Sequence, residues 1–181
     1  MIEVRIHGRG GQGAVTTGQI LAIAAFYDAN FCQTFPMFGV ERAGAPVQAF
    51  VRISDEPINI RCQVYNPDVV IVLEPSLIGV VNVADGLKKG GAIIVNTNKP
   101  AKDLGLKGDF EVHAVDATSI ALEIFKKPIV NTAMLGAFAA TTSLVTIGSL
   151  EKAIDERFAK KGAEIAELNK KSVRQVYEST K

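Results

Sequence analysis

A glycine-rich segment near the N-terminus, residues 7–14 with the sequence His-Gly-Arg-Gly-Gly-Gln-Gly-Ala, offers the clearest chemistry in this chain of 181 residues. Its Gly-x-Gly-x-x-Gly spacing is that of dinucleotide-binding loops, in which glycines allow a tight turn and close approach of a ligand. Where such a loop opens a helix, the first backbone N–H groups lack intrahelical partners and attract anions. We therefore expect a site for a phosphate-bearing group at Gly8, Arg9, Gly10, Gly11, Gln12 and Gly13.

The loop alone leaves several kinds of protein open. Nicotinamide-binding proteins carry a ribose-binding carboxylate about 20 residues further on, at the end of the second strand. Here the second expected strand, 31–35, ends in Pro36-Met37-Phe38, and Asp28 precedes it. A Walker phosphate loop is excluded, because Ala14-Val15 follows Gly13 where that motif requires Lys-Ser or Lys-Thr. A glycine turn that serves only helix packing remains an open alternative.

A second candidate is the adjacent pair Glu41 and Arg42, which lies in a segment dense in turn-forming residues, 38–46. An exposed ion pair contributes only about 0–1 kcal/mol to stability. The small residues around this pair would let another backbone approach closely. We therefore expect Glu41 and Arg42 to hold an interface with another protein chain.

The other ionisable residues form no recognisable catalytic or metal-binding set. The sequence has no nucleophile elbow, no paired carboxylates at a common strand end and no metal-type histidine spacing. The ends of the expected parallel strands supply His7, Glu74 and Asn96-Thr97, which can bind polar groups but make no obvious catalyst. Cys32 and Cys62 form no ligand-spaced cluster. We expect no catalytic residue and no metal in this chain.

Composition is that of an ordinary globular protein: 48% hydrophobic, 22% charged, with a net charge of +1. Such near-neutrality gives no reason to expect nucleic acid or a membrane as a partner. The length favours one domain, residues 1–181. Met1 leads directly into an expected strand, without an evident signal peptide, and the cysteines form no disulfide framework. We therefore expect a cytoplasmic protein.

Strands alternate with helices along the chain, the pattern of an α/β protein. The expected strands are 2–7, 31–35, 47–53, 58–60, 69–73, 92–95 and 110–115. The expected helices are 14–27, 75–88, 118–125, 131–147 and a last region that begins near Ser149 and is divided by Gly162. Asn131-Thr132 and Ser149 are the expected helix caps. Strands 47–53 and 58–60 are expected to pair as a hairpin.

These elements predict a three-layer α/β/α, Rossmann-like fold with a mixed sheet, mostly parallel with an antiparallel hairpin. Segment 131–147 is apolar on nearly every face but shorter than the roughly 20 residues that a membrane span needs. It is therefore expected as a buried or interface helix.

Four motifs, in this order along nearly the whole chain, resemble the gamma subunit of the 2-oxoacid:ferredoxin oxidoreductase family. They are Gly-Arg-Gly-Gly-Gln-Gly at 8–13, Phe-Gly-Val-Glu-Arg-Ala-Gly-Ala-Pro at 38–46, Asn-Pro-Asp with the following apolar strand at 66–73, and Asn-Thr-Ala-Met-Leu-Gly-Ala at 131–137. Together they are much more specific than the glycine loop alone. The segment 41–46 is more similar to the pyruvate and branched-chain types of the family than to the 2-oxoglutarate type.

The resemblance implies a required, non-catalytic gamma subunit, inactive alone, of an enzyme that converts a 2-oxoacid, coenzyme A and oxidised ferredoxin to acyl-CoA, carbon dioxide and reduced ferredoxin. It implies alpha, beta and delta partner subunits, which would hold the thiamine diphosphate and iron–sulfur clusters, with ferredoxin reached through the complex. Two cysteines agree with this, because a cluster needs four thiolates. Coenzyme A becomes the candidate ligand of the glycine loop. A stand-alone nucleotide-binding protein or oxidoreductase is the alternative.

Overall fold

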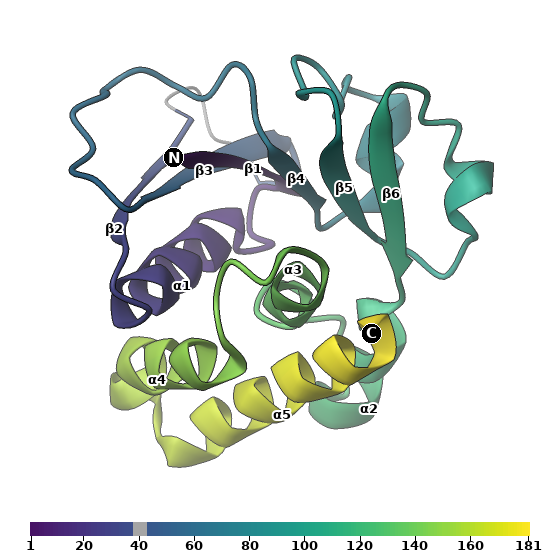
Figure 1. Ribbon diagram of the computed structural model, residues 1–181. Helices are drawn as coiled ribbons and strands as arrows, with labels where there is room; N and C mark the ends of the chain where they lie inside the picture. The colour runs from purple at the N-terminus through teal and green to yellow at the C-terminus, as the bar shows by residue number, and fades with distance from the viewer. Residues whose placement is uncertain (38–42) are drawn as a thin grey trace.

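The computed structural model describes residues 1–37 and 43–181 and contains a six-stranded sheet (Figure 1). The strands are β1 (Ile2–Arg9), β2 (Phe31–Pro36), β3 (Pro46–Ser54), β4 (Val69–Val72), β5 (Gly91–Asn96) and β6 (Phe110–Val115). Their order across the sheet is β2-β3-β1-β4-β5-β6. β1, β4, β5 and β6 run parallel, whereas β3 is antiparallel to both of its neighbours. The predicted mixed α/β sheet, mostly parallel with an antiparallel hairpin, is confirmed.

The hairpin itself is formed by β2 and β3. The prediction that 58–60 is a strand was wrong, since these residues have no regular structure. β3 already pairs with β1 on one side and β2 on the other, so it has no free edge to offer to the segment that follows it. A strand at 58–60 would have required β3 to be the edge of the sheet.

Five α-helices lie on one face of the sheet (Figure 1). They are α1 (Ala14–Tyr27), α2 (Ala117–Phe125), α3 (Met134–Thr142), α4 (Ile147–Phe158) and α5 (Ala163–Thr180). The bounds predicted for α1 and the break at Gly162 are confirmed. In the described part of the chain, no helix combines the length and apolar character that crossing a membrane requires.

The predicted helix 75–88 is replaced by a short 3-10 helix, η1 (Pro75–Gly79), followed by turns. This stretch is rich in β-branched residues and contains Gly79 and Asn82, all weak helix formers. Gly86 has φ +67°, and a Cβ there would lie 2.1 Å from the carbonyl oxygen of Tyr65. The chain therefore turns tightly past its neighbour where a helix was expected. Two further 3-10 helices, η2 (Ala101–Leu104) and η3 (Ala159–Lys161), complete the structure.

The predicted caps were also misplaced. Asn131 and Thr132 precede α3 without capping it, since its N-cap position is Ala133 and no side chain bonds to the helix start there. α4 is capped by Thr146, whose hydroxyl accepts a hydrogen bond from the N–H of Ser149 at 3.1 Å. Ser149 donates its own hydroxyl to Asp28 at 2.6 Å. Both residues are of the capping type, so the sequence pattern alone could not choose between them.

The two faces of the sheet are covered by different kinds of structure. One face packs on the α-helices, and the other carries a smaller apolar cluster of Val70, Val72, Leu77, Val83, Ile93 and Val95. This second cluster is covered by η1 and the turns after it. Alternate residues of β4 enter the two clusters, which explains why this strand is apolar throughout.

The contact between α3 and α5 depends on a glycine, and this gives a first prediction. A Cβ at Gly136 would lie 2.2 Å from the carbonyl oxygen of Val173 in α5. Gly136→Ala should therefore lower the free energy of unfolding by about 1–3 kcal/mol, measured by urea denaturation. Gly148→Ala in α4 is the control, because nothing lies within 4 Å of a Cβ there. It should leave stability unchanged or raise it by ~0.4–1 kcal/mol; equal losses in both variants would contradict the packing argument.

Candidate functional site

The glycine loop joins β1 to α1 with two residues in the left-handed region. Gly11 has φ +92° and Gly13 has φ +81°. Gly13 is the N-cap position of α1 and, having no side chain, bonds to none of the N–H groups at the helix start. The sequence prediction of a strand-to-helix turn with uncapped N–H groups is thus confirmed in its geometry.

The glycines of the loop serve different needs. A Cβ at Gly13 would come 2.8 Å from the side-chain nitrogen of Asn131, and one at Gly8 would come 3.3 Å from the Cβ of Ala14. Close packing is therefore reason enough for glycine at these two positions. Gly11 differs, because no atom of residues 1–37 or 43–181 lies within 4 Å of a Cβ placed there. Its surroundings leave room for a ligand.

The loop is tied to the residues that precede β3. The N–H of Gly10 donates to the carbonyl of Ala45 at 2.8 Å, and the N–H of Gly44 donates back to Gly10 at 3.1 Å. One guanidinium nitrogen of Arg9 donates to the carbonyl of Gly44 at 3.0 Å. These three bonds fix the loop against segment 43–46.

A second set of bonds ties the loop to the end of β4. Gln12 accepts from the N–H of Arg9 at 2.8 Å and donates its amide to the Glu74 carboxylate at 3.1 Å. The other end of the Arg9 guanidinium donates to the Ser76 hydroxyl at 2.9 Å. Arg9 thus fixes the loop to both neighbouring segments. The glycine spacing did not predict that Gln12 would link the loop to Glu74.

Glu74 remains ionised beside the loop. Burial raises the pKa of its carboxyl, but hydrogen bonds from the Ser76 N–H, the Gln12 amide and the Ser76 hydroxyl, together with the charge of Arg9, outweigh it and leave the pKa below its ordinary value. A carboxylate therefore lies close to the one cation of the loop. Any attraction for an anion has to come mainly from the N–H groups around Gly11 and the start of α1.

Beyond the carboxyl ends of β4, β5 and β6 lies an open crevice of about 670 Å³. Glu74, Asn96 and Thr97, three of the polar residues predicted at strand ends, line it together, and Ser76 connects it to the glycine loop. The Asn96 amide donates to the carbonyl of Leu73 and to the hydroxyl of Thr118, each at 3.0 Å. Asn96 therefore has a structural role, joining β4 to the start of α2.

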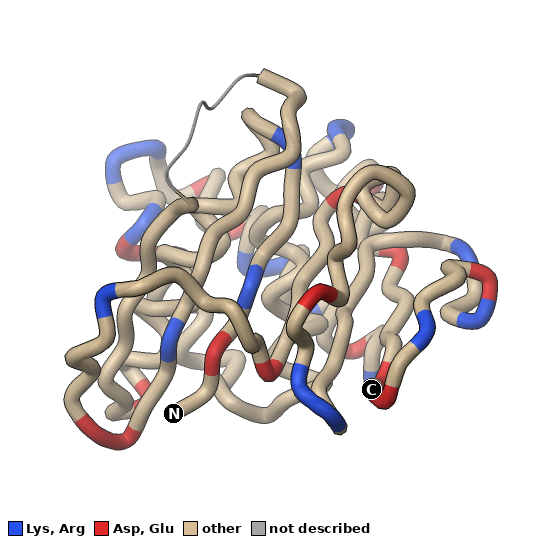
Figure 2. The backbone as a smooth tube through the Cα atoms, turned by 90° about the horizontal axis from the view of Figure 1, so that it is seen from above, with Lys and Arg blue, Asp and Glu red and all other residues tan. Residues whose placement is uncertain are grey.

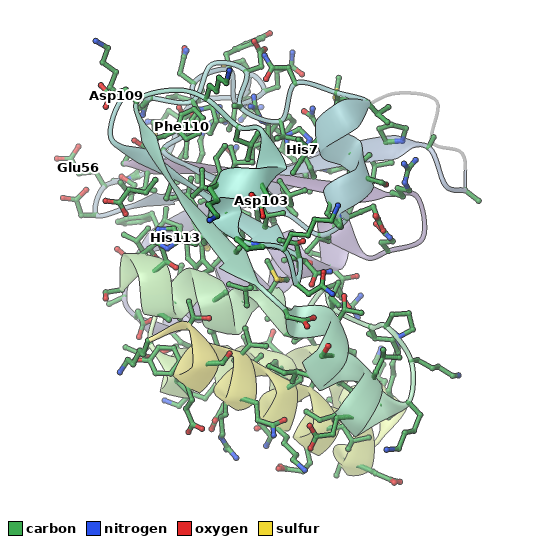
Figure 3. All side chains as sticks on the ribbon, turned by 90° about the vertical axis from the view of Figure 1, so that its right-hand side faces the viewer. His7, Glu56, Asp103, Asp109, Phe110 and His113 are labelled. Atoms are coloured by element: carbon green, nitrogen blue, oxygen red, sulfur yellow. The ribbon has the colours of Figure 1, made fainter. Side chains whose placement is uncertain are left out.

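His7 is not part of this site. Val4 and Ile6 of β1 face the helices, so the alternating His7 side chain faces the opposite side of the sheet, away from the helix layer (Figure 3). It is 2% exposed, and its Nε2 has no hydrogen-bond partner among the described residues. Burial, and after it the charge of Arg5, lowers the pKa of His7 to about 3. The imidazole is therefore neutral at physiological pH.

The remaining predicted residues add no site. Glu41 and Arg42 lie outside the described residues. Cys32 and Cys62 are free thiols, and two cysteines cannot supply the four thiolates of an iron–sulfur cluster. Within residues 1–37 and 43–181, no group of three or more potential metal ligands comes together.

Comparison with known proteins gives a consistent result over the whole chain. The sequence profile of the family described as pyruvate ferredoxin/flavodoxin oxidoreductase matches residues 3–179. Pyruvate synthase subunit PorC of Methanocaldococcus jannaschii is 56% identical over 177 residues, which cover 98% of this chain and 96% of that protein. The common subunit gamma of the pyruvate/ketoisovalerate oxidoreductases of Thermococcus litoralis is 52% identical over 183 residues, covering 99% and 97%.

Among solved structures, pyruvate oxidoreductase subunit PORC of Thermotoga maritima superposes with a TM-score of 0.86 at 40% identity. The match covers 98% of this chain and 95% of that one. The similarity in sequence is therefore accompanied by the same fold over nearly its full length.

The buried neutral histidine gives a prediction about acid stability. Because the folded-state pKa of His7 lies near 3 and its ordinary value is 6.5, the unfolded chain binds the proton more readily between these values. Stability should therefore fall as the pH drops below 6.5. His7→Gln should lack this part of the loss, so urea unfolding of both chains at about pH 7 and about pH 4 should show the smaller decrease in the variant. Parallel decreases would show that the histidine is not the cause.

Proposed function

The chain belongs to the pyruvate ferredoxin/flavodoxin oxidoreductase family, and we propose that it is the non-catalytic gamma subunit of a multi-subunit pyruvate (2-oxoacid):ferredoxin oxidoreductase. One observation carries this proposal: nearly the whole chain, 98% of it, aligns with nearly the whole of a pyruvate synthase subunit. The chain would act as one domain, residues 1–181, in the cytoplasm, with alpha, beta and delta subunits as partners.

In such a complex a 2-oxoacid, coenzyme A and oxidised ferredoxin give acyl-CoA, carbon dioxide and reduced ferredoxin. Thiamine diphosphate and iron–sulfur clusters supply the carbanion and electron-transfer chemistry. Two cysteines are too few for a cluster, so the clusters would be held by other subunits, and we assign thiamine diphosphate to those subunits by the family resemblance. The gamma chain would contribute structure and part of the approach to coenzyme A.

The choice of oxoacid would also belong to other subunits. The relative in Thermococcus litoralis is named as a subunit common to pyruvate and ketoisovalerate oxidoreductases. A subunit shared by two enzymes cannot by itself distinguish their substrates. We extend this to the present chain, whose described residues include no catalytic set that would contact an oxoacid.

We further propose that the glycine loop, Gly8 to Gly13, contacts a phosphate of coenzyme A. The space at Gly11, open with respect to the described residues, and the uncapped start of α1 support the fit, with a smaller contribution from the partly exposed guanidinium of Arg9. Glycine at 8 and 13 is explained by packing alone, so Gly11 is the position that tests the ligand. Glu41 and Arg42 are proposed as interface residues on their sequence context.

Purification of the native protein tests the proposed function. The chain should copurify with larger subunits, and the assembly should oxidise a 2-oxoacid with coenzyme A and an electron acceptor. The isolated chain, supplied with thiamine diphosphate, should show no such activity because it lacks a catalytic acid–base set. Recovery of the chain alone with a bound dinucleotide would instead favour the stand-alone oxidoreductase.

Two substitutions at Gly11 test the ligand of the loop. Asn and Asp tolerate a positive φ better than other residues and have the same size, so Gly11→Asn and Gly11→Asp should strain the turn equally. If a phosphate lies there, the added carboxylate should raise the KM for coenzyme A about fivefold more than the amide does, the equivalent of ~1 kcal/mol for two charges 4 Å apart in water. The KM for the oxoacid should be the same in both. Equal KM values for coenzyme A would favour the packing role.

A further inference from the structure

The helix-free face of the sheet, onto which Figure 2 looks, contains two buried arginines. Arg5 of β1 is 4% exposed and Arg52 of β3 is 1% exposed. In the register of the two strands Arg5 lies opposite Phe50, and Arg52 lies opposite Glu3. The two arginines thus occupy diagonal positions on the same face of neighbouring strands. A buried charge is costly unless it is paired and hydrogen-bonded. The partners of each guanidinium therefore show how far its charge is compensated.

Arg52 is fully supplied with partners. Its Nε forms a salt bridge to Glu3 at 2.8 Å. The two terminal nitrogens donate to the side chain of Gln33 at 3.0 Å and to the carbonyl of Cys62 at 2.8 Å. The guanidinium also lies 5.2 Å from the ring centre of Phe35. Arg52 therefore fastens segment 61–63 to the sheet, and its role is internal.

Arg5 is supplied only in part. One terminal nitrogen donates to the carbonyls of Val83, at 3.1 Å, and Asp85. Among the described residues, its Nε is buried without a partner and no carboxylate lies within the 4.0 Å of a salt bridge. The side chain of Asp85 is exposed to solvent, and its charge only partly offsets the burial that lowers the pKa of Arg5. Within the described residues, a buried cation is left with its buried Nε donor unused and without a direct counter-charge.

This cation borders a pocket of about 390 Å³, here named the Arg5 pocket. Phe50, Val64 and Val81 contribute apolar surface to its lining. Two further lining residues, Met37 and Tyr65, are 44% and 62% exposed. Exposed aromatic and methionine side chains around a desolvated charge are typical of the energetically dominant parts of protein interfaces.

We propose that the Arg5 pocket is a docking site for a partner subunit, which inserts an acidic side chain beside Arg5 and covers Met37 and Tyr65 with apolar residues. The proposal rests on the proposed function, which supplies the partner subunits. A carboxylate provides the two things that Arg5 lacks, which are a hydrogen-bond acceptor for Nε and a negative charge. A free small acid would satisfy the charge but leave the apolar rim exposed, so the observations favour a protein.

Gln48→Glu tests this proposal. Gln48 lines the pocket from β3, opposite His7, at a position diagonal to Arg5 that long side chains can bridge. The new carboxylate should pair with Arg5 and raise the thermal midpoint of the isolated chain by about 2–4 °C. In the complex it should repel the incoming acid and weaken association about tenfold or more. Gln19→Glu, on the exposed surface of α1, is the isosteric control and should change neither quantity.

The outcomes separate the alternatives. If the wild-type chain recovers its partner subunits and Gln48→Glu recovers them equally well, the docking site is overturned and the proposed function stands. If the wild-type chain recovers none, the proposed function itself is rejected, and the docking site with it. Stabilisation of the wild-type chain, but not of Gln48→Glu, by added acetate with association unchanged would assign the pocket to a free small acid.

A second variant covers the case in which Gln48→Glu destabilises the chain. Tyr65→Ser removes an exposed ring at the rim and should leave the thermal midpoint of the isolated chain unchanged. Association should still weaken about tenfold, since the rim of the pocket would lie within the proposed interface, where a buried tyrosine commonly contributes that much. Undiminished association in this variant would overturn the docking site.

Discussion

The rest of the structure depends on the burial of β1 on both faces between two unlike neighbours. It pairs antiparallel with β3 and parallel with β4, so it is the strand at which the hairpin meets the parallel part of the sheet. Val4 and Ile6 enter the helix-side core, whereas Arg5 and His7 face the other way and are equally buried. A strand with polar residues on one buried face needs a covering layer that supplies hydrogen-bond acceptors. The carbonyls of Val83 and Asp85, in the irregular segment on that face, do this for one terminal nitrogen of Arg5. Helical carbonyls could not, because they are already bonded within the helix.

The same strand sets the position of the glycine loop. Where β1 ends, the chain must turn into α1 while its backbone is held by segment 43–46 on one side and by Glu74 and Ser76 on the other. Arg9 and Gln12 make these links, so the two side chains between the glycines fix the shape of the turn. The consequence is a rigid loop whose open surface is concentrated at Gly11. Rigidity of this kind suits a site that receives a phosphate without rearranging.

The sequence predicts what is local or periodic and fails where the answer depends on distant neighbours. The alternation in β1 and the apolar runs of β4 and β5 predicted these strands of the sheet, and the bounds of α1 followed from apolar residues at helical spacing after the glycine loop. The prediction of a strand at 58–60 was wrong because β3 pairs with β2 on the side where that strand would have paired. This pairing depends on the order of the strands in the sheet, which the local sequence does not show. The helix at 75–88 was wrong because a tertiary contact at Gly86 and weak helix formers outweighed a plausible start at Pro75. At the site, Glu74 was foreseen as a strand-end residue, but its bond to Gln12 joins residues far apart in sequence and left no pattern to find.

The two buried arginines differ in role. Arg52 stabilises the fold of this chain, whereas we propose that Arg5 pairs with another chain. Arg52 has its carboxylate, amide, carbonyl and ring within the chain, so removing any partner would weaken the subunit itself. Arg5 is buried as deeply, but no carboxylate of residues 1–37 or 43–181 forms a salt bridge with it, and the pocket beside it is open. An unpaired buried cation lowers the stability of a free subunit, and under the proposed docking that cost would be recovered when a partner supplies the charge. A subunit with an uncompensated buried charge would be specific for its complex, since only a partner with a carboxylate at the matching position would compensate that charge.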